Sequence, residues 1–291
     1  MSTLESPSQH EGKETTLPRR WIFRGQANAN WPLESTLVRA FKASWQDWAP
    51  GPLCNRATVL KRMEGRLASD FASRAHLYGL NVAVNRPVAL LAAMQHFRAP
   101  TRLLDWTYSP YVALYFALEE KCNCKTAAVW AIDVSALHRA ASLKVLPQQH
   151  LKDGKRLVLS STKYVDFGTD ENFKEHVLQD LTDYHRSVLF GESTIENVVP
   201  LLPQAQNQRL AAQQGLFLCP SQVGPTLMGQ LAKLMRDVKA NWIVKITIPR
   251  TLRAEILRRL FRMNVHRLSL FPGPDGLGCF CAQKAEIFGW E

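Results

Sequence analysis

The stretch MQHFRAPTRLLDWTYSPYVALYFA, residues 94–117, places polar residues between two apolar segments. A buried helix is predicted from Pro87 to Phe97, because this segment is almost entirely apolar. The residue before a proline avoids the helical conformation, so a turn is predicted at Ala99-Pro100. A short strand is predicted over 101–107, and Ser109-Pro110 supplies the N-cap and first residue of a second buried helix. A core does not need charged side chains between buried helices, so the stretch predicts a functional site.

The overall composition is that of an ordinary globular protein. Hydrophobic residues make up 46% and charged residues 21% of the 291 residues, which is enough for one large domain or two small ones. The net charge of +11 favours acidic partners such as nucleic acid or nucleotides, although many basic proteins bind neither.

The positive charge is concentrated between Arg236 and Arg267, where nine basic and two acidic side chains contribute +7. The alternatives are a solvated helix face and a patch that binds a phosphate-bearing partner such as nucleic acid. The basic residues are Arg236, Lys239, Lys245, Arg250, Arg253, Arg258, Arg259, Arg262 and Arg267, and the acidic ones are Asp237 and Glu255.

The six cysteines do not have the pattern of a secreted disulfide framework. The pairs Cys122/Cys124 and Cys279/Cys281 are separated by one residue, a shorter spacing than zinc-binding loops usually have. No metal is expected. Cys279 and Cys281 lie in an apolar stretch with strand alternation, which predicts small buried residues on one face.

The N-terminal residues 1–17 are polar and are predicted to form a disordered tail before a domain over 18–291. This tail has no apolar segment of the kind found in signal peptides, and no run is long enough to span a membrane. A cytoplasmic location is therefore expected.

The order of predicted elements indicates an α+β protein. Strands alternate irregularly with helices, which favours a single mixed domain with a central, partly antiparallel sheet flanked by helices. Besides those given above, strands are predicted at 21–26, 127–133, 196–203, 242–249 and 279–288, and helices at 53–78, 134–141, 171–189 and 250–263. The basic part, 236–291, would thus be strand–helix–strand.

Three blocks together resemble the FRG domain family, which is named for its Phe-Arg-Gly signature. The first block is Phe23-Arg24-Gly25-Gln26, followed by WPLESTLVR at 31–39. The second is the stretch around MQH and PTRLLDWT, and the third, weaker block runs from Arg209 to Phe217. The resemblance covers about residues 19–220.

The order of these blocks is also similar in outline to ADP-ribosyltransferases. Those enzymes have an Arg or His on a first strand, a polar second strand leading to a helix, and a Glu on a third strand. The resemblance implies that Arg24 binds the pyrophosphate of NAD as a substrate, while His96 and Thr107 help to hold the nicotinamide ribose.

The third block departs from that outline, because it offers Gln213 and Gln214 and no glutamate. A glutamine can hydrogen-bond a ribose hydroxyl, but it lacks the charge that stabilises a developing oxocarbenium ion. Either the carboxylate comes from elsewhere, with Asp105 the best candidate, or the chemistry differs, or the protein is not catalytic.

The candidate residues follow from these blocks. Asp105 could instead be a buried ion-pair partner of Arg24 or Arg102. His96 could be a core histidine at a helix C-terminus, where the helix dipole favours its charged form. The catalytic candidates are Asp105, His96 and Gln214, and the ligand-binding candidates are Arg24, Gly25, Gln26, Thr101, Arg102, Thr107, Ser109 and Arg209.

Two functions are therefore expected. The first is an NAD-dependent ADP-ribosyltransferase-like enzyme, a transferase or glycohydrolase acting in bacterial toxin or phage-defence biology. The second is a non-catalytic module that binds a nucleotide, a nucleic acid or a protein partner of a defence system through the same cleft and the basic region Arg236–Arg267.

Overall fold

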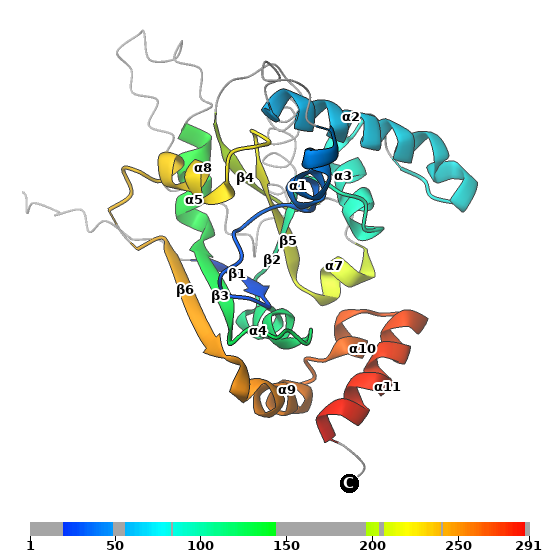
Figure 1. Cartoon of the computed structure of the whole chain (residues 1–291), viewed down its shortest axis with the longest axis vertical. Coiled ribbons are helices and arrows are strands. Elements are labelled where there is room, and N and C mark those ends of the chain that lie inside the picture. The colour runs from blue at the N-terminus through cyan, green and yellow to red at the C-terminus, as the bar shows by residue number, and fades with distance from the viewer. Residues whose placement is uncertain are drawn as a thin grey trace, which may run out of the picture.

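A six-stranded sheet forms the centre of the protein (Figure 1). The computed structural model describes residues 20–48, 56–82, 84–143, 196–203, 207–239 and 241–288; the predicted tail 1–17 and the predicted helix 171–189 lie outside these residues. The strand order is β4-β5-β2-β1-β3-β6, and every neighbouring pair is antiparallel. The α+β prediction is confirmed. The strands are β1 (Trp21–Gln26), β2 (Leu104–Thr107), β3 (Thr126–Asp133), β4 (Val198–Leu201), β5 (Gly215–Pro220) and β6 (Ile243–Pro249).

The two central strands are joined much less extensively than the others. Within the described residues, β1 and β2 share the single registered pair Phe23↔Thr107, whereas β1 pairs with β3 along its whole length. The sheet therefore consists of two well-paired halves, β4-β5-β2 and β1-β3-β6. The three blocks of the sequence resemblance reach neighbouring strands β1, β2 and β5.

Helices cover both faces of the sheet (Figure 1). One face packs its apolar side chains against α5 and α8. On the other face, α4 and α9 cover the half with β1 and β3, while α2 and α3 cover the half with β4 and β5. The helices are α1 (Thr36–Trp48), α2 (Arg56–Ala75), η1 (His76–Tyr78), α3 (Pro87–His96), α4 (Pro110–Leu118), α5 (Val134–Leu143), α7 (Gln208–Ala212), α8 (Leu227–Leu234), η3 (Arg250–Leu252), α9 (Arg253–Arg262), α10 (Arg267–Leu270) and α11 (Pro274–Phe288).

The elements around the central stretch form as the sequence predicts. Helix α3 begins with Pro87 in its first turn, and α4 has Pro110 in its first turn. The Ser109 hydroxyl accepts a hydrogen bond from the backbone N–H of Val112, which caps α4. This capping contact gives Ser109 a structural role.

Gly25 lies where β1 touches α4. A Cβ atom at this position would lie 2.0 Å from the carbonyl oxygen of Ala113 and 2.5 Å from the backbone nitrogen of Ala117. Only glycine allows the two backbones to approach this closely. Gly25, a ligand-binding candidate from the sequence, thus lies against a helix backbone.

The C-terminal part differs from the sequence prediction. Residues 279–288 belong to helix α11, so the described basic part is the strand β6 followed only by helices, and the predicted final strand is wrong. A short apolar run does not distinguish a strand from a helix, and the preceding Pro274 and Asp275 occupy the first turn of α11. Cys279 and Cys281 are exposed on this helix, which corrects their predicted burial.

The described residues show three further features. Cys122 and Cys124 form a disulfide. The described part of the chain contains no group of three His, Cys, Asp or Glu side chains placed to hold a metal ion. None of its helices is long and apolar enough to cross a membrane.

Candidate functional site

Asp105 lies in the middle of β2, and its side chain is exposed although Leu104 and Trp106 on either side are buried. The register pairs Asp105 with Phe217 of β5, so both side chains point to the same face of the sheet. On this face, Phe217 packs with the α3 cluster, while α4 covers the neighbouring half. The carboxylate therefore lies between two groups of helices that leave it accessible.

A chain of hydrogen bonds reaches the Asp105 carboxylate from α3. The side-chain amide of Gln95 donates to Oδ2 of Asp105 at 3.0 Å. The buried hydroxyl of Thr101 donates to the Oε1 atom of Gln95 at 2.6 Å. Thr101 is thus joined to Asp105 through Gln95.

Arg24 approaches Asp105 from β1, across the junction where the pairing with β2 stops. Its Nη1 atom donates to the backbone carbonyl of Asp105 at 2.6 Å. Burial lowers the pKa of the Arg24 guanidinium, and the charge of Asp105 opposes this shift. The Nε atom is buried and has no hydrogen-bond partner among the described residues. An unpaired buried donor costs about 1–3 kcal/mol, and the Nε of Arg24 is such a donor.

Arg209 comes from α7, just before β5. Its guanidinium lies over the ring of Phe271, 4.5 Å from the centroid, and makes no hydrogen bond or ion pair within the described residues. Burial lowers its pKa, while the charge of Asp105 acts in the opposite direction. Arg209 is therefore a partly desolvated cation near Asp105, with its donors unused.

His96 ends α3 and is half-buried, beside the exposed ring of Phe97. Burial lowers the pKa of His96, and the positive charge of Arg209 lowers it further. Both causes act against the effect expected of the helix dipole, which favours the charged imidazole. The neutral ring is the favoured form, because desolvation and Arg209 outweigh the helix end.

One residue near this site, Glu119, was not singled out from the sequence. Glu119, immediately after α4, forms an ion pair with Arg267 of α10. Burial raises the pKa of Glu119, although Arg267 acts in the opposite direction. The Arg267 guanidinium lies 3.7 Å from the centroid of the Phe271 ring. The sequence shows only two consecutive glutamates at a helix end, which gives no signal that one is half-buried.

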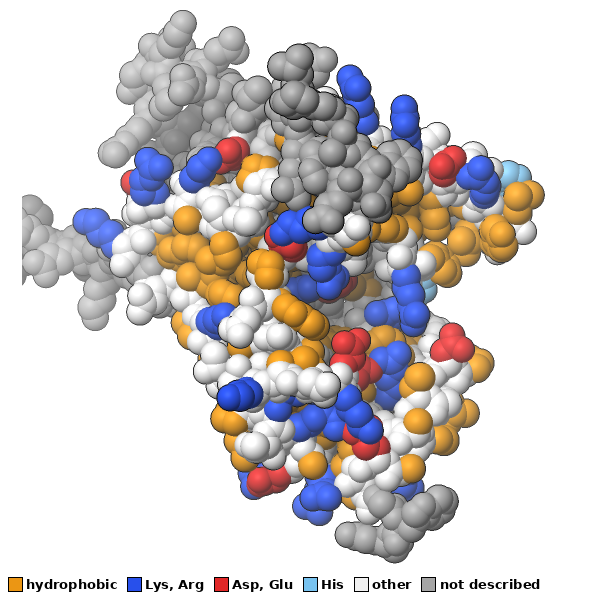
Figure 2. All heavy atoms as spheres, in the orientation of Figure 1, with side chains coloured by type: hydrophobic (Ala, Val, Ile, Leu, Met, Phe, Trp, Pro, Cys, Tyr) orange, Lys and Arg blue, Asp and Glu red, His pale blue; other side chains and the backbone are white. Residues whose placement is uncertain are grey.

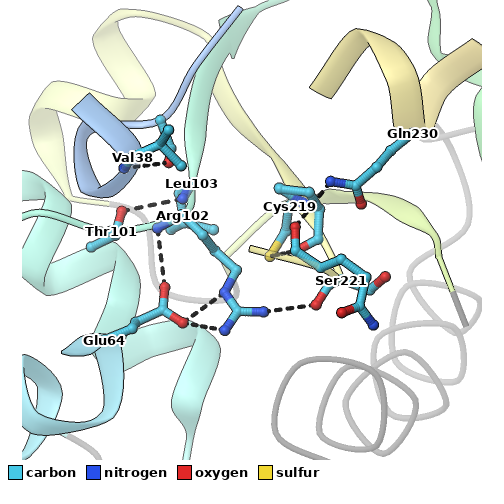
Figure 3. A network of polar contacts seen from close by, with 11 residues as sticks. Val38, Glu64, Thr101, Arg102, Leu103, Cys219, Ser221 and Gln230 are labelled. Atoms are coloured by element: carbon cyan, nitrogen blue, oxygen red, sulfur yellow. Dashed lines mark hydrogen bonds and ion pairs between the residues drawn. The ribbon is translucent and has the colours of Figure 1, made fainter. Parts of the chain in front are cut away.

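Arg102 does not face this site. It forms a fully buried ion pair with Glu64 of α2, in which its Nε donates at 2.6 Å and its backbone N–H donates to the same carboxylate (Figure 3). Its Nη1 atom donates to the carbonyl of Ser221 at 3.0 Å. The described contacts use the guanidinium to join α2 to the end of β5, so Arg102 is not available to a ligand.

A small hollow lies beside Arg102, between α1 and the loop before α8. Its lining includes Val38, Leu104, Val223 and Leu227. The only arginine that contributes to it among the described residues is the one already paired with Glu64. This hollow therefore lacks the free donors found near Asp105.

Of three other candidates, two use their side chains in internal hydrogen bonds. The amide of Gln26 donates to the carbonyl of Pro32 and accepts from the indole N–H of Trp130 at 2.6 Å. The Thr107 hydroxyl donates to the carbonyl of Gln213 at 2.7 Å. Gln214 has a positive φ of 47° and an exposed side chain where α7 turns into β5. Of these three, only Gln214 presents its side chain to solvent.

The geometry thus places the Gln95 amide against the exposed Asp105 carboxylate, with the charges of Arg24 and Arg209 close enough to interact with it. Figure 2 shows Lys and Arg side chains gathered around the middle of this face, where the surface is hollowed. Comparison with known families matches residues 19–126 to the FRG domain. The chain contains an FRG domain. The FRG match includes Arg24, Gln95 and Asp105 and ends before α7, which carries Arg209. Comparisons with curated proteins and with solved structures gave no match.

The basic C-terminal region, which lies outside the FRG match, uses many of its cations internally. Arg250 donates to the carbonyls of Ala27, Ala117 and Glu120, and Arg253 donates to those of Leu118 and Glu119. The bonds to Ala117 and Leu118 satisfy C-terminal carbonyls of α4, which have no partner within the helix. Lys245, Arg258, Arg259 and Arg267 also have partners in the protein. A nucleic-acid partner for this region stays a prediction.

Proposed function

We propose that the FRG domain binds a nucleotide of the NAD type and cleaves its glycosidic bond at Asp105, as an ADP-ribosyltransferase-like enzyme. The observation that carries this proposal is an exposed carboxylate on a central strand, with the unused guanidinium donors of Arg24 and Arg209 close by. Two cations beside one carboxylate suit a substrate that carries phosphates next to a reacting sugar.

The arrangement of strands supports the outline of the proposed reaction. Arg24 is on β1, Asp105 is on β2, and Gln214 directly precedes β5, while β2 leads into α4 through Ser109. Blocks about 80 and 110 residues apart in the chain thus reach three adjacent strands. The same order of parts is implied by the resemblance to ADP-ribosyltransferases.

The proposed chemistry assigns a role to each group. The bond between ribose C1′ and the nicotinamide nitrogen breaks, and its electron pair leaves with nicotinamide. Asp105 stabilises the positive charge that develops on the ribose, while Arg24 and Arg209 hold the phosphates. The acceptor forms the new bond to C1′, and its proton passes to His96, which is favoured in the neutral form.

The test is incubation of the purified protein with NAD, scored for released nicotinamide and for ADP-ribose transferred to protein, DNA or RNA. Asp105→Asn should reduce turnover by about 100-fold or more, because it removes the charge and keeps the shape. Asp70→Asn is the matched control, since Asp70 is an exposed carboxylate on α2 paired with Arg74.

The outcomes separate the two expected functions. Turnover lost with Asp105→Asn and kept with Asp70→Asn supports the enzyme. Binding of NAD without turnover, lost with Arg209→Ala, supports the non-catalytic module. If the protein shows no binding of NAD and no turnover of it, the proposal is contradicted. A role in toxin or phage-defence biology rests on the family resemblance alone.

A further inference from the structure

We propose that Thr101 is a positioning residue, which fixes the orientation of the Asp105 carboxylate through Gln95. This inference rests on the proposed function of Asp105. Its basis is the chain of hydrogen bonds that runs from a buried hydroxyl to an exposed carboxylate.

The direction of each hydrogen bond in this chain is determined by its neighbours. The Thr101 oxygen accepts a hydrogen bond from the backbone N–H of Leu103 at 3.2 Å, so its own O–H is free to donate to Gln95. The Oε1 atom of Gln95 accepts that proton, which places the NH₂ group toward Asp105. The reversed amide would place an oxygen against the carboxylate and leave Thr101 without an acceptor.

Thr101 is itself held firmly by the first turn of α1. Its backbone N–H donates to the Oγ1 atom of Thr36 at 3.1 Å, and the Thr36 hydroxyl donates to the carbonyl of Thr101 at 3.2 Å. The same carbonyl accepts from the backbone N–H of Leu37 at 3.1 Å. The relative exposure of Thr101 is 0%, so it cannot touch a ligand.

The consequence for Asp105 is a fixed carboxylate on an otherwise open surface. An exposed aspartate without a partner samples several rotamers, and only some would direct an oxygen at the substrate. Gln95 holds Oδ2, which leaves Oδ1 to face the ribose. Arg24 holds the backbone of the same residue, so both parts of Asp105 are oriented before substrate binds.

The variants that test this role are Thr101→Val and Thr101→Ser. Valine keeps the branched shape and removes the hydroxyl, whereas serine keeps the hydroxyl. Thr101→Val should lower kcat about 10- to 100-fold with little change in KM, because misplacement of a reacting group affects the chemical step. Thr101→Ser should recover most of kcat. Thr247→Val, on the exposed side of β6, is the matched control.

A second readout needs no substrate. The side-chain amide signals of Gln95 in a ¹H–¹⁵N spectrum should move in both Thr101→Val and Asp105→Asn, and stay in place in Thr247→Val. Unchanged Gln95 signals in both variants would contradict the hydrogen-bonded chain from Thr101 to Asp105, whatever the activity.

The two proposals fail in different ways. Absence of NAD turnover in the wild-type protein would contradict the proposed function. The Gln95 signals would still show whether the hydrogen-bonded chain from Thr101 to Asp105 exists. Wild-type turnover together with full kcat in a folded Thr101→Val protein would overturn the positioning role alone. Loss of kcat in both Thr101→Val and Thr101→Ser would also overturn it, because the hydroxyl would then not be the deciding group.

Discussion

The arginines beside Asp105 and the arginines of the C-terminal region differ in what their donors do. Arg250 and Arg253 donate to carbonyls at the end of α4, and Arg258 donates to the carbonyl of Ile287. Near Asp105, by contrast, Arg24 has an unpaired Nε and Arg209 makes no hydrogen bond within the described residues. The local density of positive charge therefore does not locate the candidate anion site. Unused donors do.

The arginines whose donors are used inside the protein form a structural group. The largest effect is expected at Arg102, the most deeply buried of them. Arg102→Met would leave Glu64 buried without a partner, which should lower the free energy of unfolding by about 3–5 kcal/mol. Urea unfolding measures the change. Arg74→Met is the control, because the exposed pair Arg74–Asp70 should contribute only about 0–1 kcal/mol. Equal changes in the free energy of unfolding at the two positions would contradict the distinction between buried and exposed arginines.

A smaller loss of stability is expected at Arg253. Arg253→Met leaves two carbonyls at the end of α4 without a donor, and should cost about 1.5–3 kcal/mol in the same assay. NAD binding should stay unchanged. Arg262→Met provides the control, since Arg262 on the same helix has no partner among the described residues. Reduced NAD affinity in folded Arg253→Met would show that this region contributes to the site.

Arg209 should behave in the opposite way. Arg209→Met removes a cation–π contact with Phe271, worth about 0.5–2 kcal/mol for a partly buried pair, so stability should fall less than in Arg253→Met. NAD affinity measured by calorimetry should fall about tenfold or more, which corresponds to about 1.4 kcal/mol. Loss of stability without loss of affinity would assign Arg209 to the structural group.

The smallest effect concerns pH. The pKa of His96 is lowered in the folded protein, so the unfolded chain binds more protons between that pKa and about 6.5. The free energy of unfolding should therefore rise with pH across this window. On acidification below it, the stabilisation that neutral His96 provides is lost. His96→Gln should flatten the curve from pH 5 to 7 relative to wild type. His266, whose pKa is also lowered by burial, remains in both proteins. Parallel curves for the two proteins would count against this assignment.

The sequence predicts the local structure around Asp105 well, because the signals there are local. Pro87, Ser109 and Pro110 act within one helical turn, and each has the predicted position. The strand at 21–26 is also confirmed. These elements could be predicted because proline and capping residues restrict the backbone wherever they occur.

Contacts between distant residues could not be predicted in this way. The partner of Arg102 is Glu64, which lies 38 residues earlier on another helix. Gly25 is a ligand-binding candidate from the sequence, but the backbone that lies against it is that of α4. The half-buried state of Glu119 likewise depends on α10, far along the chain. Such roles follow from packing between elements, which periodicity does not encode.

The single registered pair between β1 and β2 has a mechanical consequence. Hydrogen-bonded ladders transmit shear between strands, and the ladder at this junction is far shorter than the one between β1 and β3. A twisting load would therefore concentrate at this seam, where the half-sheet with Asp105 meets the half-sheet with Arg24. The bond from Arg24 to the carbonyl of Asp105 crosses the seam and stiffens it. The spacing between the Arg24 guanidinium and the Asp105 carboxylate therefore depends on this short junction.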